Sequence, residues 1–168
     1  MPRRRRLPPL VREAAQLLLL VAVVLTGRAS LADQYVVPTG SMAPTVQVGD
    51  RVLVSKLAYG LRVPLTERYV ARFAPPARGD VVVLVSPENG MVLLKRVAAV
   101  PGDRVDFDGG EVTVPPDQFL VLGDNRGNSH DGRAFGLVAG CAILGRAEGV
   151  FWRDGTPTWV GLQAPARP

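Results

Sequence analysis

The fold is decided by the stretch Asp80-Val-Val-Val-Leu-Val-Ser-Pro-Glu-Asn-Gly-Met-Val-Leu-Leu94, in which a turn signal separates two short apolar runs. Short valine-rich runs that are bounded by Pro, Asn and Gly are typical of buried strands. The intervening Pro87-Glu-Asn-Gly90 is short enough to join the two runs as a hairpin. We therefore expect two neighbouring antiparallel strands in the middle of the chain.

The same pattern continues on both sides of this hairpin. Further apolar runs are Arg51-Val-Leu-Val54, Glu111-Val-Thr-Val114 and Gln118-Phe-Leu-Val-Leu122, and Gly-Asp or Gly-Gly pairs lie between them. Short strands separated by such turn signals are typical of antiparallel β domains. The fold prediction is therefore mainly β, with a compact antiparallel β domain over residues 33–162 and a loose C-terminal end at residues 163–168.

The N-terminus has a different composition. Residues 1–13 form a basic tail, and residues 14–32 begin with an apolar run from Ala14 to Thr26 that only Gln16 interrupts. Basic residues before an apolar run keep the N-terminus in the cytoplasm and send the following chain outward. We expect one N-terminal membrane helix in residues 14–32, which makes the protein a single-pass plasma-membrane protein in contact with lipid, its β domain lying outside the cytoplasm.

The apolar run is short for this role, since its helix would measure about 20 Å against about 30 Å of hydrocarbon. A cleavable secretory signal is the alternative, because Ser30-Leu31-Ala32 before Asp33 has the small-x-small form of a cleavage sequence. In either case the chain after residue 33 lies outside the cytoplasm.

Composition excludes several classes of function. The net charge is +5, but five of the 20 lysines and arginines lie in the first 12 residues, whereas a nucleic-acid binder carries its charge on a folded face. One histidine and one cysteine are too few for a zinc site or a disulfide. We expect no metal, no cofactor and no nucleic-acid partner, and we expect Cys141 to be a small buried residue.

Ser41 lies in Pro38-Thr-Gly-Ser-Met-Ala-Pro-Thr45, where two prolines constrain the turn and the glycine lets another backbone approach closely. A serine nucleophile needs a base. Lys95 continues an apolar run, where burial would lower its pKa and let it accept a proton, but its side chain could equally extend to solvent. The alternative base is His130 in Ser129-His130-Asp131, as part of a Ser-His-Asp triad.

The segment Pro38–Thr45 resembles the nucleophile box of bacterial type I signal peptidases. Later segments resemble the other boxes of that family in the same order, namely Gly49–Lys56, Arg78–Val83 with Lys95–Asp103, and Gly123–Arg133. The resemblance implies a β fold of the type shared with self-cleaving repressor proteases. It also implies a single-domain version of the family, because only a short segment separates Asp103 from Gly123.

The resemblance implies a role for each matching residue. Ser41 would be the nucleophile and Lys95 the general base, with the Ser41 N–H and the Thr39 hydroxyl as the oxyanion hole. Thr39 stands where the family usually has serine, and Gly127 and Gly132 also depart from its pattern. The remaining matches are Ser129, which would orient the lysine; Asp124, Arg126, Asp131 and Arg133, which would brace the site; and Val37, Met42, Val46, Leu93 and Leu94, which would line the substrate pockets.

The implied function is a serine endopeptidase that removes N-terminal signal peptides from exported preproteins. It would form an acyl-enzyme and cut after small-x-small sequences. Two alternatives remain: a peptidase dedicated to one substrate, and a non-enzymatic exported β module that binds peptides. A self-cleaving repressor is disfavoured because the N-terminus has no room for a DNA-binding domain. The oligomeric state is left open.

Overall fold

The computed structural model describes residues 11, 13, 16–18, 32–62, 69–107 and 110–162. The predicted basic tail and membrane helix lie almost wholly outside the described residues, and the predicted C-terminal end, residues 163–168, lies wholly outside them. Among the residues that are described, no helix has the length and the apolar character needed to cross a membrane.

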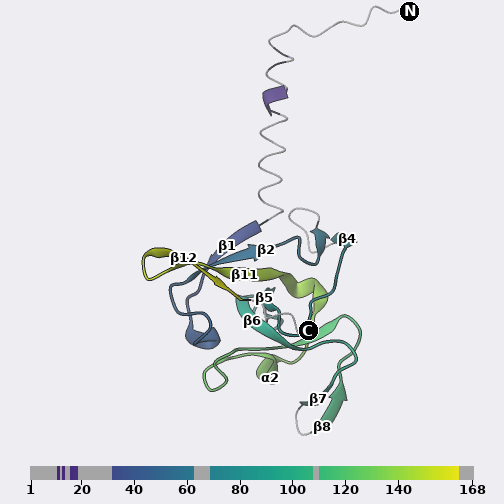
Figure 1. The fold of residues 1–168 in the computed structure, drawn as a ribbon. Helices are drawn as coiled ribbons and strands as arrows, with labels where there is room; N and C mark the ends of the chain where they lie inside the picture. Colours follow the sequence, from purple (N-terminus) through teal and green to yellow (C-terminus); the bar gives the residue numbers. More distant parts are fainter. Residues whose placement is uncertain are drawn as a thin grey trace, which may run out of the picture.

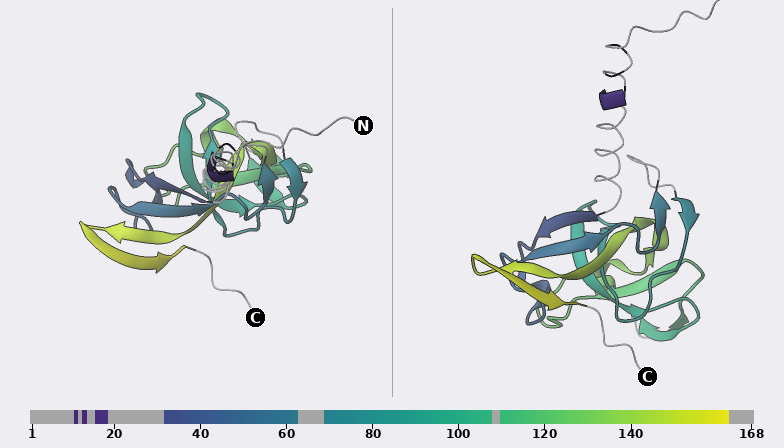
Figure 2. Two further views of the ribbon diagram at one scale, coloured as in Figure 1. Left: turned by 90° about the horizontal axis from the view of Figure 1, so that it is seen from above. Right: turned by 45° about the horizontal axis from the view of Figure 1, so that its top comes forward.

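An eight-stranded antiparallel sheet dominates the fold, which confirms the mainly β prediction. The sheet curls on itself (Figures 1 and 2). Seven of its strands form one continuous order, and the eighth, β12, pairs with β11 outside that order. In the order β1-β2-β11-β5-β6-β9-β10, its strands are Ala32–Val36, Arg51–Ser55, Ile143–Arg153, Val81–Val85, Val92–Ala99, Gln118–Leu122 and Val138–Ala139, with β12 at Thr156–Gly161.

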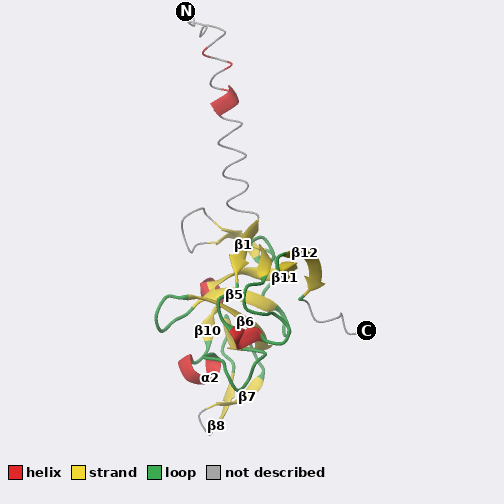
Figure 3. Cartoon of the chain, turned by 90° about the vertical axis from the view of Figure 1, so that its left-hand side faces the viewer, coloured by secondary structure: helices red, strands yellow, loops and turns green. Residues whose placement is uncertain are grey.

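Two separate hairpins and three short helical turns complete the described part of residues 32–162, and loops connect them to the sheet (Figure 3). The hairpins are β3 (Gly60–Arg62) with β4 (Tyr69–Arg72), and β7 (Arg104–Phe107) with β8 (Gly110–Thr113). The turns are η1 (Gly40–Met42), α2 (Gly132–Phe135) and η2 (Gly140–Ala142). Cys141 in η2 is exposed, so the prediction of a buried cysteine was wrong.

The predicted hairpin is formed by β5 and β6. Val85 faces Val92 and Val81 faces Arg96 across the ladder, and Ser86 N–H donates to the Met91 carbonyl at 2.8 Å. β5 is buried on both faces because its alternating valines enter two cores, Val81 and Val83 on one side and Val82 with Leu84 on the other. A continuous apolar run, without polar alternation, suits a strand in this position.

The longest strand, β11, was not singled out by its sequence pattern. Its first seven residues alternate buried and half-buried positions, but after Ile143 the buried ones are small: Gly145, Ala147 and Gly149. A Cβ at Gly145 would lie 2.6 Å from the Ser55 carbonyl oxygen, so only glycine lets β2 and β11 approach this closely. Sequence patterns detect large apolar residues, and three of the buried positions of this strand carry a small side chain or none.

Candidate active site

Ser41 lies in η1, the turn between β1 and β2. Backbone hydrogen bonds tie the start of this segment to the start of β2, since Val37 N–H donates to the Asp50 carbonyl at 2.9 Å and the Val37 carbonyl accepts from Gly49 N–H at 2.8 Å. Met42 is fully buried in the core and anchors the turn. Ser41 itself is half-buried and lines a pocket.

Lys95 reaches Ser41 from β6. Its Nζ lies 2.9 Å from Ser41 Oγ and also donates to the Leu94 carbonyl at 3.2 Å. Only 2% of the Lys95 surface is exposed. Burial lowers the pKa of this amine, and the nearby Asp131 carboxylate opposes part of that effect. A buried amine with a lowered pKa, in contact with a serine hydroxyl, can accept a proton from it.

Asp131 supplies a buried negative charge behind the lysine. It is completely buried, and its carboxylate accepts from Gly123 N–H at 2.9 Å and from the Arg133 guanidinium at 2.9 and 3.0 Å. Burial alone would raise the pKa of Asp131, but these donors and the neighbouring Ser129 hydroxyl hold it well below its usual range. The carboxylate therefore stays ionised and keeps the loop after β9 folded against the site.

The Ser129 hydroxyl is buried and has no hydrogen-bond partner of ordinary geometry among the described residues. It packs beside Gly123, where a Cβ would overlap its Oγ and would also lie 2.5 Å from the Ser41 carbonyl oxygen. Gly123 thus separates Ser129 from Ser41 by the thickness of one backbone. The neighbour of this hydroxyl is the Asp131 carboxylate, whose pKa the hydroxyl helps to lower, and the lone pairs of its oxygen can accept a hydrogen bond from a donor that reaches the site.

A second ion pair joins β6 to the same loop. The Arg96 guanidinium binds the Asp124 carboxylate through two hydrogen bonds of 2.7 and 2.9 Å, and it also donates to the Gly79 carbonyl at 2.8 Å. Arg126, in contrast, is exposed and contacts the network through its backbone, where its carbonyl accepts from Arg133 at 2.8 Å. The four residues predicted to brace the site therefore all lie in one connected network.

A pocket of about 220 Å³ opens beside the serine and the lysine. Its predominantly apolar wall contains four of the five residues predicted to line substrate pockets, together with Thr39, Ser41 and Lys95; the four are Val37, Met42, Leu93 and Leu94. Val46 is not among the lining residues and lies fully buried in the core. The pocket therefore combines a nucleophile, a candidate base and a small apolar surface.

Comparison with known proteins identifies the family of this chain. Residues 10–114 and 107–152 match the protein family described as signal peptidase, peptidase S26. The chain belongs to this signal peptidase family. Membership confirms the resemblance drawn from the sequence and the predicted enzyme class, a peptidase of the signal peptidase I type.

Individual relatives match over most of the chain. Signal peptidase I from Leptolyngbya laminosa is 33% identical, with 86% of this chain and 80% of that protein aligned. Signal peptidase I from Pseudomonas aeruginosa is 28% identical over 88% of this chain and 75% of its own. A probable signal peptidase I-2 from Synechocystis is 32% identical over 74% of this chain and 65% of its own.

The other candidate base, His130, does not contact Ser41 and lies at the surface. His130 is exposed, its Nε2 lies 2.6 Å from the Glu88 carboxylate, and its ring packs edge-on against Phe135. Asp131, the third member of the alternative triad, is bound by Arg133 and Gly123. Ser41 therefore contacts Lys95, whereas His130 contacts Glu88 and Phe135.

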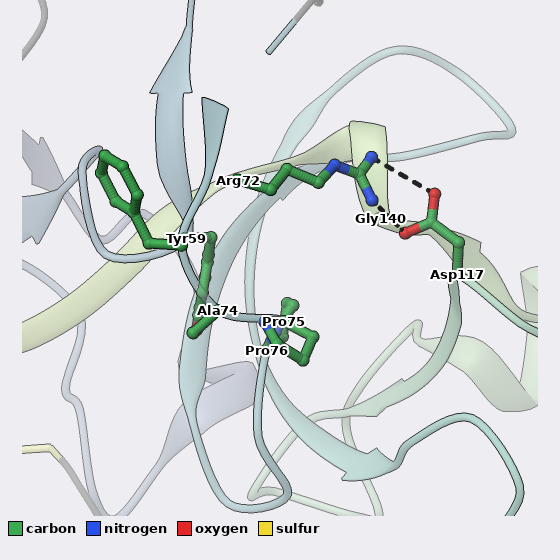
Figure 4. A pocket seen from close by; sticks show the side chains of 8 residues that line it. Tyr59, Arg72, Ala74, Pro75, Pro76, Asp117 and Gly140 are labelled. Carbon is green, nitrogen blue, oxygen red and sulfur yellow. Dashed lines mark hydrogen bonds and ion pairs between the residues drawn. The ribbon is translucent and has the colours of Figure 1, made fainter. Parts of the chain in front are cut away.

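A second pocket, of about 250 Å³, lies between the β3–β4 hairpin and η2. Figure 4 shows Arg72 and Asp117 joined across one side of it, at 2.7 and 3.3 Å, with Pro75 and Pro76 on the opposite wall. Tyr59 also lines this pocket, and its hydroxyl donates to the Asp80 carboxylate at 2.7 Å. The lining residues include no serine or lysine, so this pocket lacks the residue types that the resemblance assigns to catalysis.

Sequence reasoning assigned no role to three residues that contact the site. Arg96 binds Asp124, Gly123 separates Ser41 from Ser129, and Asn125 donates to the backbone of the Ser41 turn. All three stand inside the segments that resemble family boxes, next to residues with assigned roles. Their position in those boxes was a signal, but only the contacts reveal what each residue does.

Proposed function

We propose that this protein is a serine endopeptidase that removes N-terminal signal peptides from exported preproteins, with Ser41 as nucleophile and Lys95 as general base. One observation carries the proposal, the hydrogen bond of 2.9 Å between Lys95 Nζ and Ser41 Oγ at a lysine that is 2% exposed. Family membership supports signal peptide removal, and this contact supports the specific pair of residues.

The reaction begins with neutral Lys95. Burial lowers the pKa of its amine, so the neutral form is populated nearer to physiological pH than for a lysine in water. Ser41 Oγ–H then donates to Nζ, and as Oγ attacks the scissile carbonyl carbon its proton passes to the amine. The resulting oxyanion accepts hydrogen bonds from the Ser41 N–H and the Thr39 hydroxyl, where one such donor is worth about 3 kcal/mol.

The same amine completes both halves of the reaction. When the C–N bond breaks, protonated Lys95 gives its proton to the departing amine, which is the new N-terminus of the mature protein. The signal peptide stays esterified to Ser41 as an acyl-enzyme. Water then attacks this ester while Lys95 takes a proton from it, and the collapse returns that proton to Ser41 Oγ.

The loop after β9 would hold the lysine in position for these transfers. Ser129 has a buried hydroxyl without an ordinary hydrogen-bond partner among the described residues, and it lies close to Asp131, whose charge acts on Lys95. We assign Ser129 to orienting the lysine, and Asp124, Arg126, Asp131 and Arg133 to bracing the loop.

The pocket supports cleavage after small-x-small sequences. Its volume of about 220 Å³ must accommodate an extended peptide, so space remains only for small side chains at the inward positions. β9 pairs with β6 from Arg96 onward, and in the described chain this leaves one edge of Val92–Lys95 without a strand partner. A substrate strand could add to that edge and present alternate residues to Leu93 and Leu94.

The proposed location is the outer face of the plasma membrane. The basic tail and the apolar run of residues 14–32 would anchor the enzyme with its N-terminus in the cytoplasm. Tethering the site near the bilayer raises its effective concentration toward substrates that are themselves membrane-bound.

The test is cleavage of a preprotein with an Ala-x-Ala site by the full chain in detergent or lipid. Ser41→Ala and Lys95→Met should each lower the rate at least roughly 10³-fold, since each removes one member of a concerted pair. Lys56→Met is the matched control, because Lys56 is the only other lysine and its Nζ pairs with Asp33 at 3.1 Å. His130→Ala should also keep full activity.

Two results would overturn the proposal. Full activity in Lys95→Met would exclude the lysine as base. If a serine-reactive acylating probe failed to label Ser41 in folded wild-type protein, the peptide-binding module would be the better account.

A further inference from the structure

One residue outside the assigned set, Asn125, contacts the backbone on both sides of Ser41. Its side-chain Nδ2 donates to the Gly40 carbonyl at 3.1 Å, and its backbone N–H donates to the Ser41 carbonyl at 3.0 Å. Because both acceptors are carbonyl oxygens, the side-chain atom facing Gly40 must be the amide nitrogen. Asn125 therefore fixes two consecutive peptide units of the nucleophile turn.

The Gly40 carbonyl belongs to the same peptide unit as the Ser41 N–H. A trans peptide is planar, so its C=O and N–H point in opposite directions, and holding the oxygen sets the direction of the hydrogen. The Gly40 carbonyl also accepts from Ala43 N–H at 3.1 Å. Two donors on this oxygen fix the plane and polarise the unit, which makes its N–H a better donor.

Little else restrains this peptide unit. Gly40 has the widest backbone freedom of any residue, and no atom lies within 4 Å of the position its Cβ would take. Thr39, at the N-cap of η1, makes no side-chain capping hydrogen bond. Met42 anchors the end of the turn in the core, and Asn125 adds a restraint from another loop at the point where the backbone of the turn is freest.

Asn125 is in turn linked to the strand that carries Lys95. Its neighbour Asp124 is bound to Arg96 by two hydrogen bonds, and Arg96 directly follows Lys95 on β6. The contacts form a closed ring from Lys95 through Arg96, Asp124 and Asn125 to Ser41, which the hydrogen bond between Ser41 and Lys95 completes. Such a ring sets the relative position of the two reacting side chains.

We propose that Asn125 is a positioning residue for the oxyanion hole: its amide aligns the Ser41 N–H toward the oxyanion of the tetrahedral intermediate. This inference rests on the proposed function. It predicts a loss that falls on the transition state, where the oxyanion exists, and leaves binding of the uncharged substrate nearly unchanged.

The experiment compares Asn125→Ala and Asn125→Asp with wild type as full chains in detergent, using the same Ala-x-Ala substrate. Both variants keep the backbone N–H that binds Ser41 and lose the donor to Gly40. Asp has the shape of Asn, so it serves as the test if the alanine variant does not fold. Asn128→Ala is the matched control, since Asn128 lies in the same loop with an exposed side chain.

We expect kcat to fall about 10- to 100-fold in both variants, while KM changes less than about threefold. This fall in kcat is smaller than the fall of about 100- to 1,000-fold that follows removal of a whole oxyanion donor. A peptide aldehyde, which forms a tetrahedral adduct with a nucleophilic serine, should lose affinity in proportion to kcat/KM. If Asn125 only stabilises the fold, its substitution should lower the melting temperature, and the loss of aldehyde affinity should not follow the loss of kcat/KM.

Unchanged kcat in either folded variant, or a loss confined to KM, would overturn the inference while wild-type and Ser41→Ala controls still support the proposed function. If wild-type protein shows no Ser41-dependent cleavage, the proposed function fails, and the inference falls with it. The two failures are therefore distinguishable in one set of assays.

Discussion

Replacing Gly123 with alanine would place a methyl group between Ser41 and Ser129. The new Cβ would overlap Ser129 Oγ and would lie 2.6 Å from Ser129 Cβ and 2.5 Å from the Ser41 carbonyl oxygen, where ordinary contacts measure 3.4–4 Å. The backbone of Gly123 has no positive φ, so alanine is conformationally permitted and the effect is purely steric. Relief requires the turn and the loop to separate by about 1 Å.

Two magnitudes follow from this separation. Overpacking a closely fitted site costs about 1–3 kcal/mol, and one of the three contacts here is with backbone, which yields little, so we expect about 2 kcal/mol less unfolding free energy. A displacement of 1 Å between reacting groups can lower the rate about 100-fold. Activity should therefore fall in protein that is still folded.

The assays are urea unfolding followed by circular dichroism, and initial rates of preprotein cleavage. Gly127→Ala is the matched control, because Gly127 lies in the same loop and a Cβ there meets nothing within 4 Å. Adding Ser129→Gly to Gly123→Ala removes two of the three short contacts and should restore part of the stability. An unfolding free energy within about 0.5 kcal/mol of wild type, together with unchanged kcat/KM, would refute the reasoning.

Three further predictions concern charged residues. Because burial lowers the pKa of Lys95, kcat/KM should rise with pH around a midpoint below the value of about 10.4 for a lysine in water; a midpoint at or above that value in initial-rate measurements contradicts the burial argument. The folded-state pKa of Asp131 is depressed, so its stabilising effect is complete above the unfolded value of about 3.9 and is lost as pH falls below it. Arg133→Ala raises that folded-state pKa and should move acid unfolding, followed by circular dichroism, to higher pH; an unmoved transition would show that Arg133 is not the main partner. Arg153 binds the buried Asp50 carboxylate at 2.9 Å from Nε. Arg153→Ala should lower the unfolding free energy by about 2 kcal/mol in urea, less than for a fully buried pair because Arg153 is partly exposed; a change below about 0.5 kcal/mol would show that water or another residue replaces it.

Part of the fold could be predicted from local patterns. The runs that became β2, β5 and β9 were visible because their apolar residues are consecutive or alternate over a few positions. β6 was expected to include Lys95, but its continuation to Ala99 was not marked, because Arg96 interrupts its apolar character. In β6 the Ser41 hydroxyl and the nearby Asp131 charge offset part of the desolvation of the buried lysine.

The sequence by itself determined which side chains could act as a base for Ser41. It offers one histidine and only two lysines, and only Lys95 lies in an apolar run, so the candidate bases for Ser41 follow from the residue types alone. The antiparallel β class was likewise determined locally, because strand patterning and turn residues act over a few positions.

Only the tertiary structure decided how these parts meet. Ser41 and Lys95 lie 54 positions apart in the sequence, yet Lys95 Nζ lies 2.9 Å from Ser41 Oγ. His130 instead contacts Glu88 on the β5–β6 turn. Asn125 reaches across 85 positions to Gly40, and the packing of Gly145 in β11 against Ser55 depends on a strand far away in the sequence. Contacts between distant segments depend on the register and curl of the whole sheet, which no local pattern encodes.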